Sequence, residues 1–240
     1  MRILLIGYGK MGKAIEQVAL QKGHSIAYTI DLANSALLTN INPKTVDIAI
    51  EFTQPEAAYH NIYQCLSQGI PTLSGTTGWL HHKEAIEQYC QKKGGTFFYA
   101  TNFSIGVNIF FKLNELLAKL MCQRPEYKVA LEEIHHTTKQ DVPSGTAITL
   151  AADIIKNIPS KKQWITVPTN QEDTISINSQ RRSDVPGTHI VTYTALLDTL
   201  EIKHTAHSRE GFALGAVLVA EWIQGQKGIL GMQDFLQLAC

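Results

Sequence analysis

The first half of the chain alternates short apolar runs with amphipathic stretches, which predicts alternating strands and helices. Residues 3–6 form an uninterrupted apolar run, typical of a parallel strand that is buried on both faces. Apolar residues then recur at helical spacing from Met11 to Ala19, Gly23 ends this helix, and a second strand is expected over residues 25–30. This strand–helix–strand order predicts a parallel sheet covered by helices.

The same alternation continues to about residue 103. We expect strands over residues 46–53, 70–79 and 96–104, separated by helices over residues 54–69 and 81–94. The pattern of the first half therefore predicts a Rossmann-like nucleotide-binding domain with a parallel sheet, spanning residues 1–103.

The second half has a different pattern, with a long amphipathic helix followed by a β-rich region. Helices are expected over residues 105–121 and 144–157, a strand over 127–136, and antiparallel strands between 164 and 205. This predicts an α+β domain with a mixed or antiparallel sheet over residues 104–208, which we expect to bind substrate and to mediate oligomerisation. An apolar helix with a tail over 211–230 predicts that the segment 209–240 packs back on the first domain.

Composition and charge exclude several classes of function. The 240 residues are 44% apolar, and 21 basic residues balance 21 acidic ones, so the chain lacks the basic surface that nucleic-acid binding requires. The four cysteines form no CxxC pair, and no apolar run reaches the roughly 18 residues of a membrane span. We expect a cytoplasmic protein without membrane or nucleic-acid partners, in which a local cluster of positive groups holds any anionic ligand.

A glycine motif follows the first strand. Gly7, Gly9 and Gly12 have the GxGxxG spacing, in which the first glycine permits a tight turn, the second leaves room for a pyrophosphate and the third lets the helix pack closely. Asp31 stands at the end of the second strand, where an acid accepts hydrogen bonds from an adenosine ribose. Asp31 favours NADH, because a 2′-phosphate would meet its charge, and we expect NADH as the preferred cofactor. Lys10 in the loop could reach a phosphate, so NADPH stays open.

The other strand ends are expected to complete a cofactor crevice, because ligands of open parallel sheets bind at the carboxyl ends of the strands. The residues at these ends are small, hydroxylated or aromatic: Phe52 and Thr53, then Gly75, Thr76 and Thr77, then Ala100, Thr101, Asn102 and Phe103.

The segment 135–147, HHTTKQDVPSGTA, concentrates proton-transfer and anion-binding groups. His135 titrates near neutrality, Lys139 supplies a positive charge and a proton, and Asp141 is expected to orient Lys139 or shape the turn. Ser144 is the expected N-cap of the following helix. The backbone amides of Ser144, Gly145 and Thr146 then predict a pocket for a carboxylate.

A zinc site is the alternative for this half of the chain. Its histidines are His135, His136, His189, His204 and His207, and Glu132 and Glu133 are nearby acids. No HExxH motif or comparable ligand spacing is present, so we expect no metal.

Seven segments together resemble one known family. They are GYGKMGKAIE (7–16), EFTQPEA (51–57), SGTTGW (74–79), ATNFSIGVNIF (100–110), EEIHHTTKQDVPSGTA (132–147), RRSDVPGTH (181–189) and HSREGFALGAVLVAEW (207–222). Over nearly its whole length the chain resembles the 4-hydroxy-tetrahydrodipicolinate reductases (dihydrodipicolinate reductases) of bacterial lysine biosynthesis.

The resemblance implies an oxidoreductase that uses NAD(P)H to reduce a cyclic dicarboxylate, and a homotetramer built through the second domain's sheet. It implies that His135 is a proton donor and acceptor, that Lys139 is a proton donor, and that His136, Gly145 and Thr146 contact the substrate. It places cofactor contacts at Gly7, Tyr8, Gly9, Lys10, Met11 and Gly12, at Asp31, and at the strand-end segments 75–77 and 100–103.

The chain departs from the family pattern in three places. The segment between Asp31 and Val46 is short, Ser183 replaces a glycine that is usual in the family, and Thr101 stands where proline is common. Two other functions remain open: a reductase of the same architecture for another imine or carbonyl acid, and a non-catalytic module that senses NADH.

Overall fold

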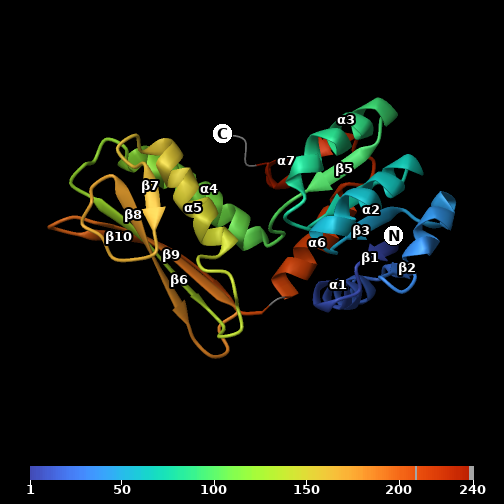
Figure 1. Ribbon diagram of the computed structural model, residues 1–240, viewed down its shortest axis with the longest axis horizontal. Coiled ribbons are helices and arrows are strands. Elements are labelled where there is room, and N and C mark those ends of the chain that lie inside the picture. The colour runs from blue at the N-terminus through green and yellow to red at the C-terminus, as the bar shows by residue number, and fades with distance from the viewer. Residues whose placement is uncertain (209, 238–240) are drawn as a thin grey trace. The chain divides into compact units, whose positions relative to one another are not determined.

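The computed structural model describes residues 1–208 and 210–237, and the chain divides into two compact units (Figure 1). Unit 1 comprises Met1–Ile105 and the chain from Glu210 onward, and unit 2 is the chain between them, starting at Gly106. The return of the C-terminal segment to unit 1 can be followed from Glu210 to Gln237, while residue 209 and residues 238–240 lie outside the described part.

Unit 1 contains a six-stranded parallel sheet with the order β11-β5-β4-β3-β1-β2. The strands are β1 (Arg2–Ile6), β2 (Ser25–Ile30), β3 (Ile48–Glu51), β4 (Thr72–Ser74), β5 (Thr96–Tyr99) and β11 (Gly228–Leu230). All six run in the same direction, so the loops that follow them leave the sheet at one edge.

Helices cover both faces of this sheet, as its continuous apolar strands require. Ile3 and Leu5 of β1 share a core with α1 (Lys10–Gln21) and α6 (Glu210–Trp222). Leu4 and Ile6 of the same strand face a second core that includes the 3₁₀ helix η1 (Ser35–Asn40) and Cys65 of α2 (Pro55–Ser67). The remaining short elements are η2 (Pro43–Thr45), η3 (Leu80–His82), α3 (Lys83–Lys93) and α7 (Met232–Leu236).

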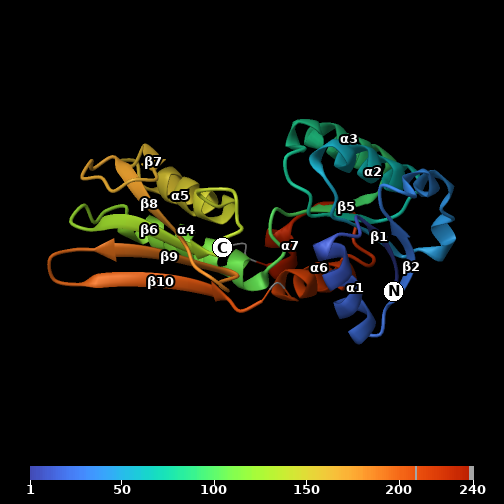
Figure 2. The same ribbon diagram turned by 60° about the horizontal axis from the view of Figure 1, so that its bottom comes forward.

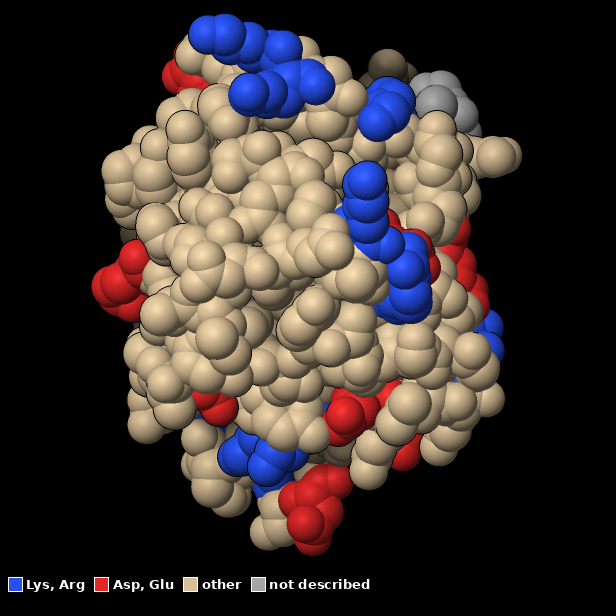
Figure 3. All heavy atoms as spheres, turned by 90° about the vertical axis from the view of Figure 1, so that its right-hand side faces the viewer, with Lys and Arg blue, Asp and Glu red and all other residues tan. Residues whose placement is uncertain are grey.

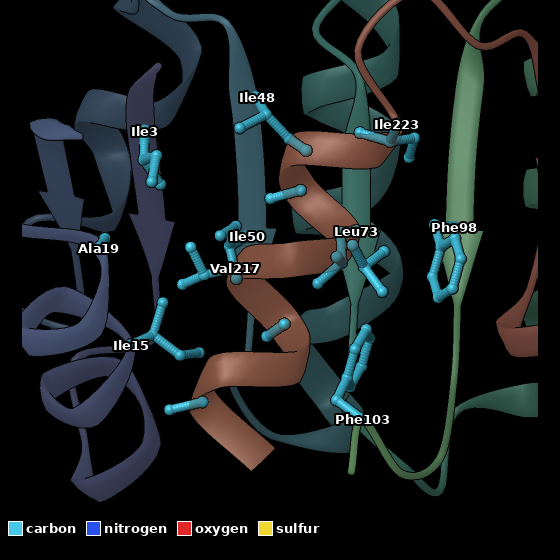
Figure 4. Packing of buried hydrophobic residues seen from close by; sticks show 14 of the residues in the cluster. Ile3, Ile15, Ala19, Ile48, Ile50, Leu73, Phe98, Phe103, Val217 and Ile223 are labelled. Atoms are coloured by element: carbon cyan, nitrogen blue, oxygen red, sulfur yellow. The ribbon is translucent and has the colours of Figure 1, made fainter. Parts of the chain in front are cut away.

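Helix α6 completes the core of unit 1 although it comes from the far end of the chain. Figure 4 shows Val217 of α6, and Ile223 just after the end of this helix, among Ile50, Leu73 and Phe98 of three neighbouring strands. A stretch of small residues on α6, with Ala213, Gly215 and Ala216 all buried, lets the helix approach the sheet closely. This contact holds the segment that begins at Glu210 against the sheet of unit 1.

Unit 2 consists of a five-stranded sheet and two helices, visible from two directions in Figures 1 and 2. The strand order is β10-β9-β6-β8-β7, with β6 (Lys128–His135), β7 (Gln163–Ile165), β8 (Thr174–Arg181), β9 (Gly187–Thr194) and β10 (Thr199–Ala206). Helices α4 (Ile105–Met121) and α5 (Gly145–Asn157) pack on one face, where Phe110 and Leu150 join a core with Val129, Ile175 and Val191.

The structure corrects the predicted direction of two strands and adds one strand that the sequence analysis did not predict. The sheet is mixed, which was one of the two predicted forms: β9 is antiparallel to β6 and to β10, but β8 is parallel to both β6 and β7, where we predicted antiparallel strands. The physical reason is that the chain returns along the sheet before each of these strands: α5 is the crossover between β6 and β7, and residues 166–173 carry the chain back between β7 and β8. The predicted apolar helix ends at Trp222, and positive φ values at Gly225 and Gly228 turn the tail that follows it into the unpredicted strand β11.

The face of the protein drawn in Figure 3 carries side chains of both charges. In Figure 3, lysine, arginine, aspartate and glutamate side chains are dispersed over the face that is drawn and leave a broad uncharged area between them. Among the described residues, none of the helices is both long enough and apolar enough to span a bilayer.

We predict that Gly215→Ala destabilises the protein, because a Cβ at this position would lie 1.8 Å from the carbonyl oxygen of Phe103. Overpacking of this kind typically costs about 1–3 kcal/mol, and urea unfolding would measure the loss. Gly211→Ala is the matched control on the same helix, because a Cβ there meets nothing within 4 Å. Equal stability of the two variants would contradict the close packing of α6.

Candidate active site

The glycine loop after β1 has the geometry of a dinucleotide-binding turn. Gly7 has a φ of +94°, and a Cβ there would lie 2.0 Å from the carbonyl oxygen of Phe52. A Cβ at Gly12 would lie 2.1 Å from the carbonyl oxygen of Gly7, so this glycine lets α1 start close to the turn. A Cβ at Gly9 would meet nothing within 4 Å, which leaves the start of α1 open to a ligand.

A cavity of about 540 Å³ lies beside this loop. Asp31 lines the cavity, and its carboxylate accepts a hydrogen bond from the Ala33 amide at 2.9 Å. Among the described residues that line the cavity, none is lysine or arginine. The lining residues are Ile6, Gly7, Tyr8, Gly9, Ile30, Asp31, Leu32, Ala33, Ser35, Phe52, Thr53, Gln54, Ala57 and Asn61.

The structure brings only part of the predicted cofactor set to this cavity. Gly7, Tyr8, Gly9, Asp31, Phe52 and Thr53 line it. The rest of the predicted set does not line the cavity in the described chain. It comprises Lys10, Met11 and Gly12 in the first turn of α1, and the segments 75–77 after β4 and 100–103 after β5. Phe103 nevertheless contacts the cavity residue Phe52, with ring centroids 5.4 Å apart.

A glutamate that sequence reasoning missed joins two of these strand ends. Glu51, the last residue of β3, is fully buried and accepts hydrogen bonds from the Thr53 amide at 3.0 Å, from Ser74 Oγ at 2.6 Å and from Thr76 Oγ1 at 2.8 Å. Burial raises the pKa of Glu51 despite these bonds. The loops after β3 and β4 are thus tied to one carboxylate, and this fixes Thr53 and Thr76 relative to each other.

In unit 2, strand β6 ends in the predicted proton-transfer segment. Its side chains alternate, so Val129, Leu131, Glu133 and His135 are buried against the helices. His135 is the last strand residue, and only 6% of its surface is exposed.

The turn after β6 carries Lys139. Its ammonium group lies 2.8 Å from both carboxylate oxygens of Asp141, as expected for an aspartate that orients it. Arg181 of β8 holds the same turn, donating to the carbonyl oxygen of Asp141 at 2.7 Å and to that of Lys139 at 3.4 Å. The Nδ1 of His136 lies 2.8 Å from the Thr138 hydroxyl in the same turn.

The start of α5 follows directly. Ser144 is the N-cap, and its hydroxyl accepts from the Ala147 amide at 3.2 Å, as predicted. The Ser144 amide itself donates to both oxygens of Glu133, at 3.0 and 3.2 Å. The predicted three-amide pocket is therefore corrected: the Ser144 amide is already occupied, and the helix start offers the amides of Gly145 and Thr146.

Glu133, His135 and His189 form a buried group whose possible ligand atoms all lie within 4.8 Å of one another, a set that could hold a metal ion. However, the Glu133 oxygens already accept from the Ser144 amide, and the Arg181 guanidinium lies 3.6 Å away. The guanidinium is a cation beside the carboxylate, and it disfavours the binding of a metal cation to the same oxygens. The contacts therefore favour a Glu133 carboxylate that accepts hydrogen bonds from protein groups over one that binds a metal ion.

Burial governs the charge of both histidines. It lowers the pKa of His189 to about 3, so this ring is neutral near pH 7. The Nε2 atom of His189 is hydrogen-bonded to the Ser144 hydroxyl at 3.1 Å. Burial also lowers the pKa of His135, while the negative charge of Glu133 opposes that shift. Burial likewise opposes ionisation of Glu133, but the hydrogen bonds from Ser144 and the charge of His135 keep its pKa below the usual value.

Sequence reasoning gave no role to Arg181 and treated Glu133 and His189 only as possible zinc ligands. The alternation that placed Val129 and Leu131 on the buried face also places Glu133 there, which was a usable signal. Arg181 and His189 come from β8 and β9, and only the pairing of these strands with β6 brings them to the site.

Comparison with known proteins covers both units. Residues 1–103 match the family described as "Dihydrodipicolinate reductase, N-terminus" and residues 106–236 match "Dihydrodipicolinate reductase, C-terminus". The 4-hydroxy-tetrahydrodipicolinate reductase of Christiangramia forsetii is 45% identical over 98% of both chains. That of Methanosarcina barkeri is 36% identical over 84% of this chain and 77% of its own.

A solved structure has the same fold over the same length. Dipicolinate-bound dihydrodipicolinate reductase from Paenisporosarcina sp. TG-14 superposes with a TM-score of 0.78 at 20% identity, covering 98% of this chain and 99% of its own. The family matches, the relatives and the fold agree, and the chain belongs to the dihydrodipicolinate reductase family, a group of NAD(P)-dependent oxidoreductases.

Proposed function

We propose that this protein reduces 4-hydroxy-tetrahydrodipicolinate to tetrahydrodipicolinate in the diaminopimelate and lysine pathway. The reaction consumes one NAD(P)H and one proton and releases NAD(P)⁺ and one water. The observation that carries the proposal is the full-length match to reductases of this name, 45% identical to the first relative over 98% of the chain. The cluster around His135 and Lys139 supplies the proton-transfer groups that such a reaction needs.

Unit 1 is the proposed cofactor site. NAD(P)H would supply the hydride there, with the open backbone at Gly9 facing its pyrophosphate and Asp31 its adenosine ribose. NADH is the preferred cofactor, because Asp31 would repel the 2′-phosphate of NADPH and the cavity lining, in the described residues, has no basic side chain to hold it.

Unit 2 is the proposed substrate site, because a cyclic dicarboxylate needs donors for its carboxylates and a proton source. The amides of Gly145 and Thr146 at the start of α5 are the donors for one carboxylate. Lys139 and His136 provide further donors on the turn before them. Lys139 Nζ donates the proton that balances the hydride, and His135 acts beside it as proton donor and acceptor.

Assembly into a homotetramer through the sheet of unit 2 is part of the same proposal. Helices α4 and α5 cover one face of this sheet, so the other face can serve as an interface between copies. At the turn between β9 and β10, Leu196 and Leu197 are 98% and 93% exposed, which is costly for adjacent leucines unless a partner covers them. A cytoplasmic location fits a biosynthetic enzyme of this kind.

We predict that the wild-type protein oxidises NADH only when the hydroxylated substrate is generated in situ by the preceding synthase. We also predict that Lys139→Ala lowers kcat about a hundredfold or more, because the variant loses the proposed proton donor. The fall in NADH absorbance measures both. Lys156→Ala, an exposed lysine on α5, is the control and should retain wild-type turnover. Cofactor binding without oxidation in the wild type would instead support a different substrate or a sensing module.

Asp31→Asn tests the cofactor preference. Removing the charge that faces the ribose should raise the NADPH-to-NADH ratio of kcat/KM about tenfold, which corresponds to about 1.4 kcal/mol. Glu84→Gln on α3 removes the same charge from an exposed position outside the cavity wall and should leave the ratio unchanged. An unchanged ratio in the Asp31 variant would show that other groups decide the preference.

A further inference from the structure

We infer that Glu133 is a positioning residue for the proposed reduction: its carboxylate fixes the start of α5 and holds the ring of His135 in one tautomer. This inference rests on the proposed function, because it assigns His135 and the helix start their roles in that reaction. Glu133 is not placed in contact with substrate and acts only through its neighbours.

The contacts of Glu133 converge from four segments of unit 2. Its oxygens lie 3.0 and 3.2 Å from the Ser144 amide, 3.5 Å from His135 Nδ1, 3.6 Å from Arg181 and 3.9 Å from His189 Nε2. The side chain is completely buried. A buried carboxylate is costly unless its oxygens are well satisfied, so these contacts fix its position closely.

The first consequence concerns the helix start. An amide at the first turn of a helix lacks an intrahelical partner, and a carboxylate is a favourable one. Because Glu133 takes the Ser144 amide, the end of β6 and the start of α5 are linked directly by hydrogen bonds. The next amides, of Gly145 and Thr146, are then presented in a fixed direction to the substrate carboxylate.

The second consequence concerns His135. Its Nδ1 is buried, has no hydrogen-bond partner among the described residues and lies nearest to the Glu133 carboxylate, whereas its Nε2 lies on the side of Gly187, 3.2 Å from where a Cβ would be. A carboxylate beside Nδ1 favours the tautomer that carries the proton there. Nε2 is then the nitrogen left to exchange a proton.

The charges around His135 come from every element packed against it. Glu133 on β6 and Asp141 in the turn raise its pKa, while Lys139 in the turn and Arg181 on β8 lower it. His189 on β9 packs edge-on at 4.9 Å between ring centroids and is neutral near pH 7. Removing the negative charge of Glu133 must therefore lower the pKa of His135.

The test is Glu133→Gln, which keeps the shape and one oxygen acceptor but removes the charge. We expect kcat to fall tenfold to a hundredfold, KM for NADH to stay within about twofold, and the pKa of His135 to move to lower pH. Nitrogen NMR of histidine-labelled protein measures the tautomer and the pKa directly. In the wild type His135 should carry its proton on Nδ1, and in the variant the tautomers should mix.

Glu132→Gln is the matched control, because Glu132 is the preceding residue on β6, points to the other face and accepts hydrogen bonds from Asn178 and Gln180 at 3.1 and 3.0 Å. It should leave kcat and the pKa of His135 unchanged. An equal effect of both variants would overturn the inference, as would wild-type kcat and an unshifted His135 in the Glu133 variant.

Two further readouts keep the inference testable. If Glu133→Gln does not fold, the wild-type spectrum alone decides, because a proton found mainly on Nε2 of His135 overturns the proposed positioning. If the wild-type protein fails to oxidise NADH with the substrate, the proposed function fails, while the tautomer and pKa still report whether Glu133 orients His135.

Discussion

Each unit buries one glutamate completely near the carboxyl end of an interior strand, and the functional loops are arranged around these two carboxylates. Glu51 ends β3 and Glu133 lies two residues before the end of β6. A carboxylate in such a place must find donors, and in both units these include neighbouring strand ends and the loops that follow strands at that edge. The hydrogen bonds that satisfy the buried carboxylate oxygens therefore also fix the positions of the loops.

The two glutamates differ in the charge of their surroundings, and this separates their roles. Glu51 is bonded to hydroxyl groups and an amide, so burial dominates and its pKa is raised. Glu133 has Arg181 and His135 beside it, and its pKa is lowered. The first organises loops near the proposed cofactor cavity, whereas the second holds a negative charge beside the groups that we propose to transfer protons.

The sequence predicted the parallel half of the fold well, because a parallel strand and an amphipathic helix differ in hydrophobic period. It did not predict the direction of β8, since alternation of side chains is the same in parallel and antiparallel strands. Strand β11 has only three residues and follows two glycine turns, so its apolar residues looked like the end of α6. Its pairing with β5 depends on a contact between distant segments.

The candidate site was predictable where its residues are close in the chain and not where they come from separate strands. The segment 135–147 pointed to His135, Lys139 and the N-cap Ser144 because their chemistry is concentrated in one stretch. The structure confirms the N-cap, and the roles of His135 and Lys139 stay predictions. Arg181 contributes through hydrogen bonds to the carbonyl oxygens of that stretch, and no local pattern marks a side chain that binds backbone forty residues away. The occupied Ser144 amide was likewise visible only once β6 and α5 were placed together.

The ion pair between Lys139 and Asp141 has a consequence for substrate binding. If Lys139 binds a substrate carboxylate, its ammonium group exchanges the Asp141 carboxylate for that of the substrate. Before the substrate binds, Asp141 keeps the ammonium group oriented. The Asp141 side chain is 57% exposed, and exposed pairs of this kind contribute only about 0–1 kcal/mol, so the exchange costs little. A chain with no net charge can thus present a positive group to a dianion without leaving that group unpaired.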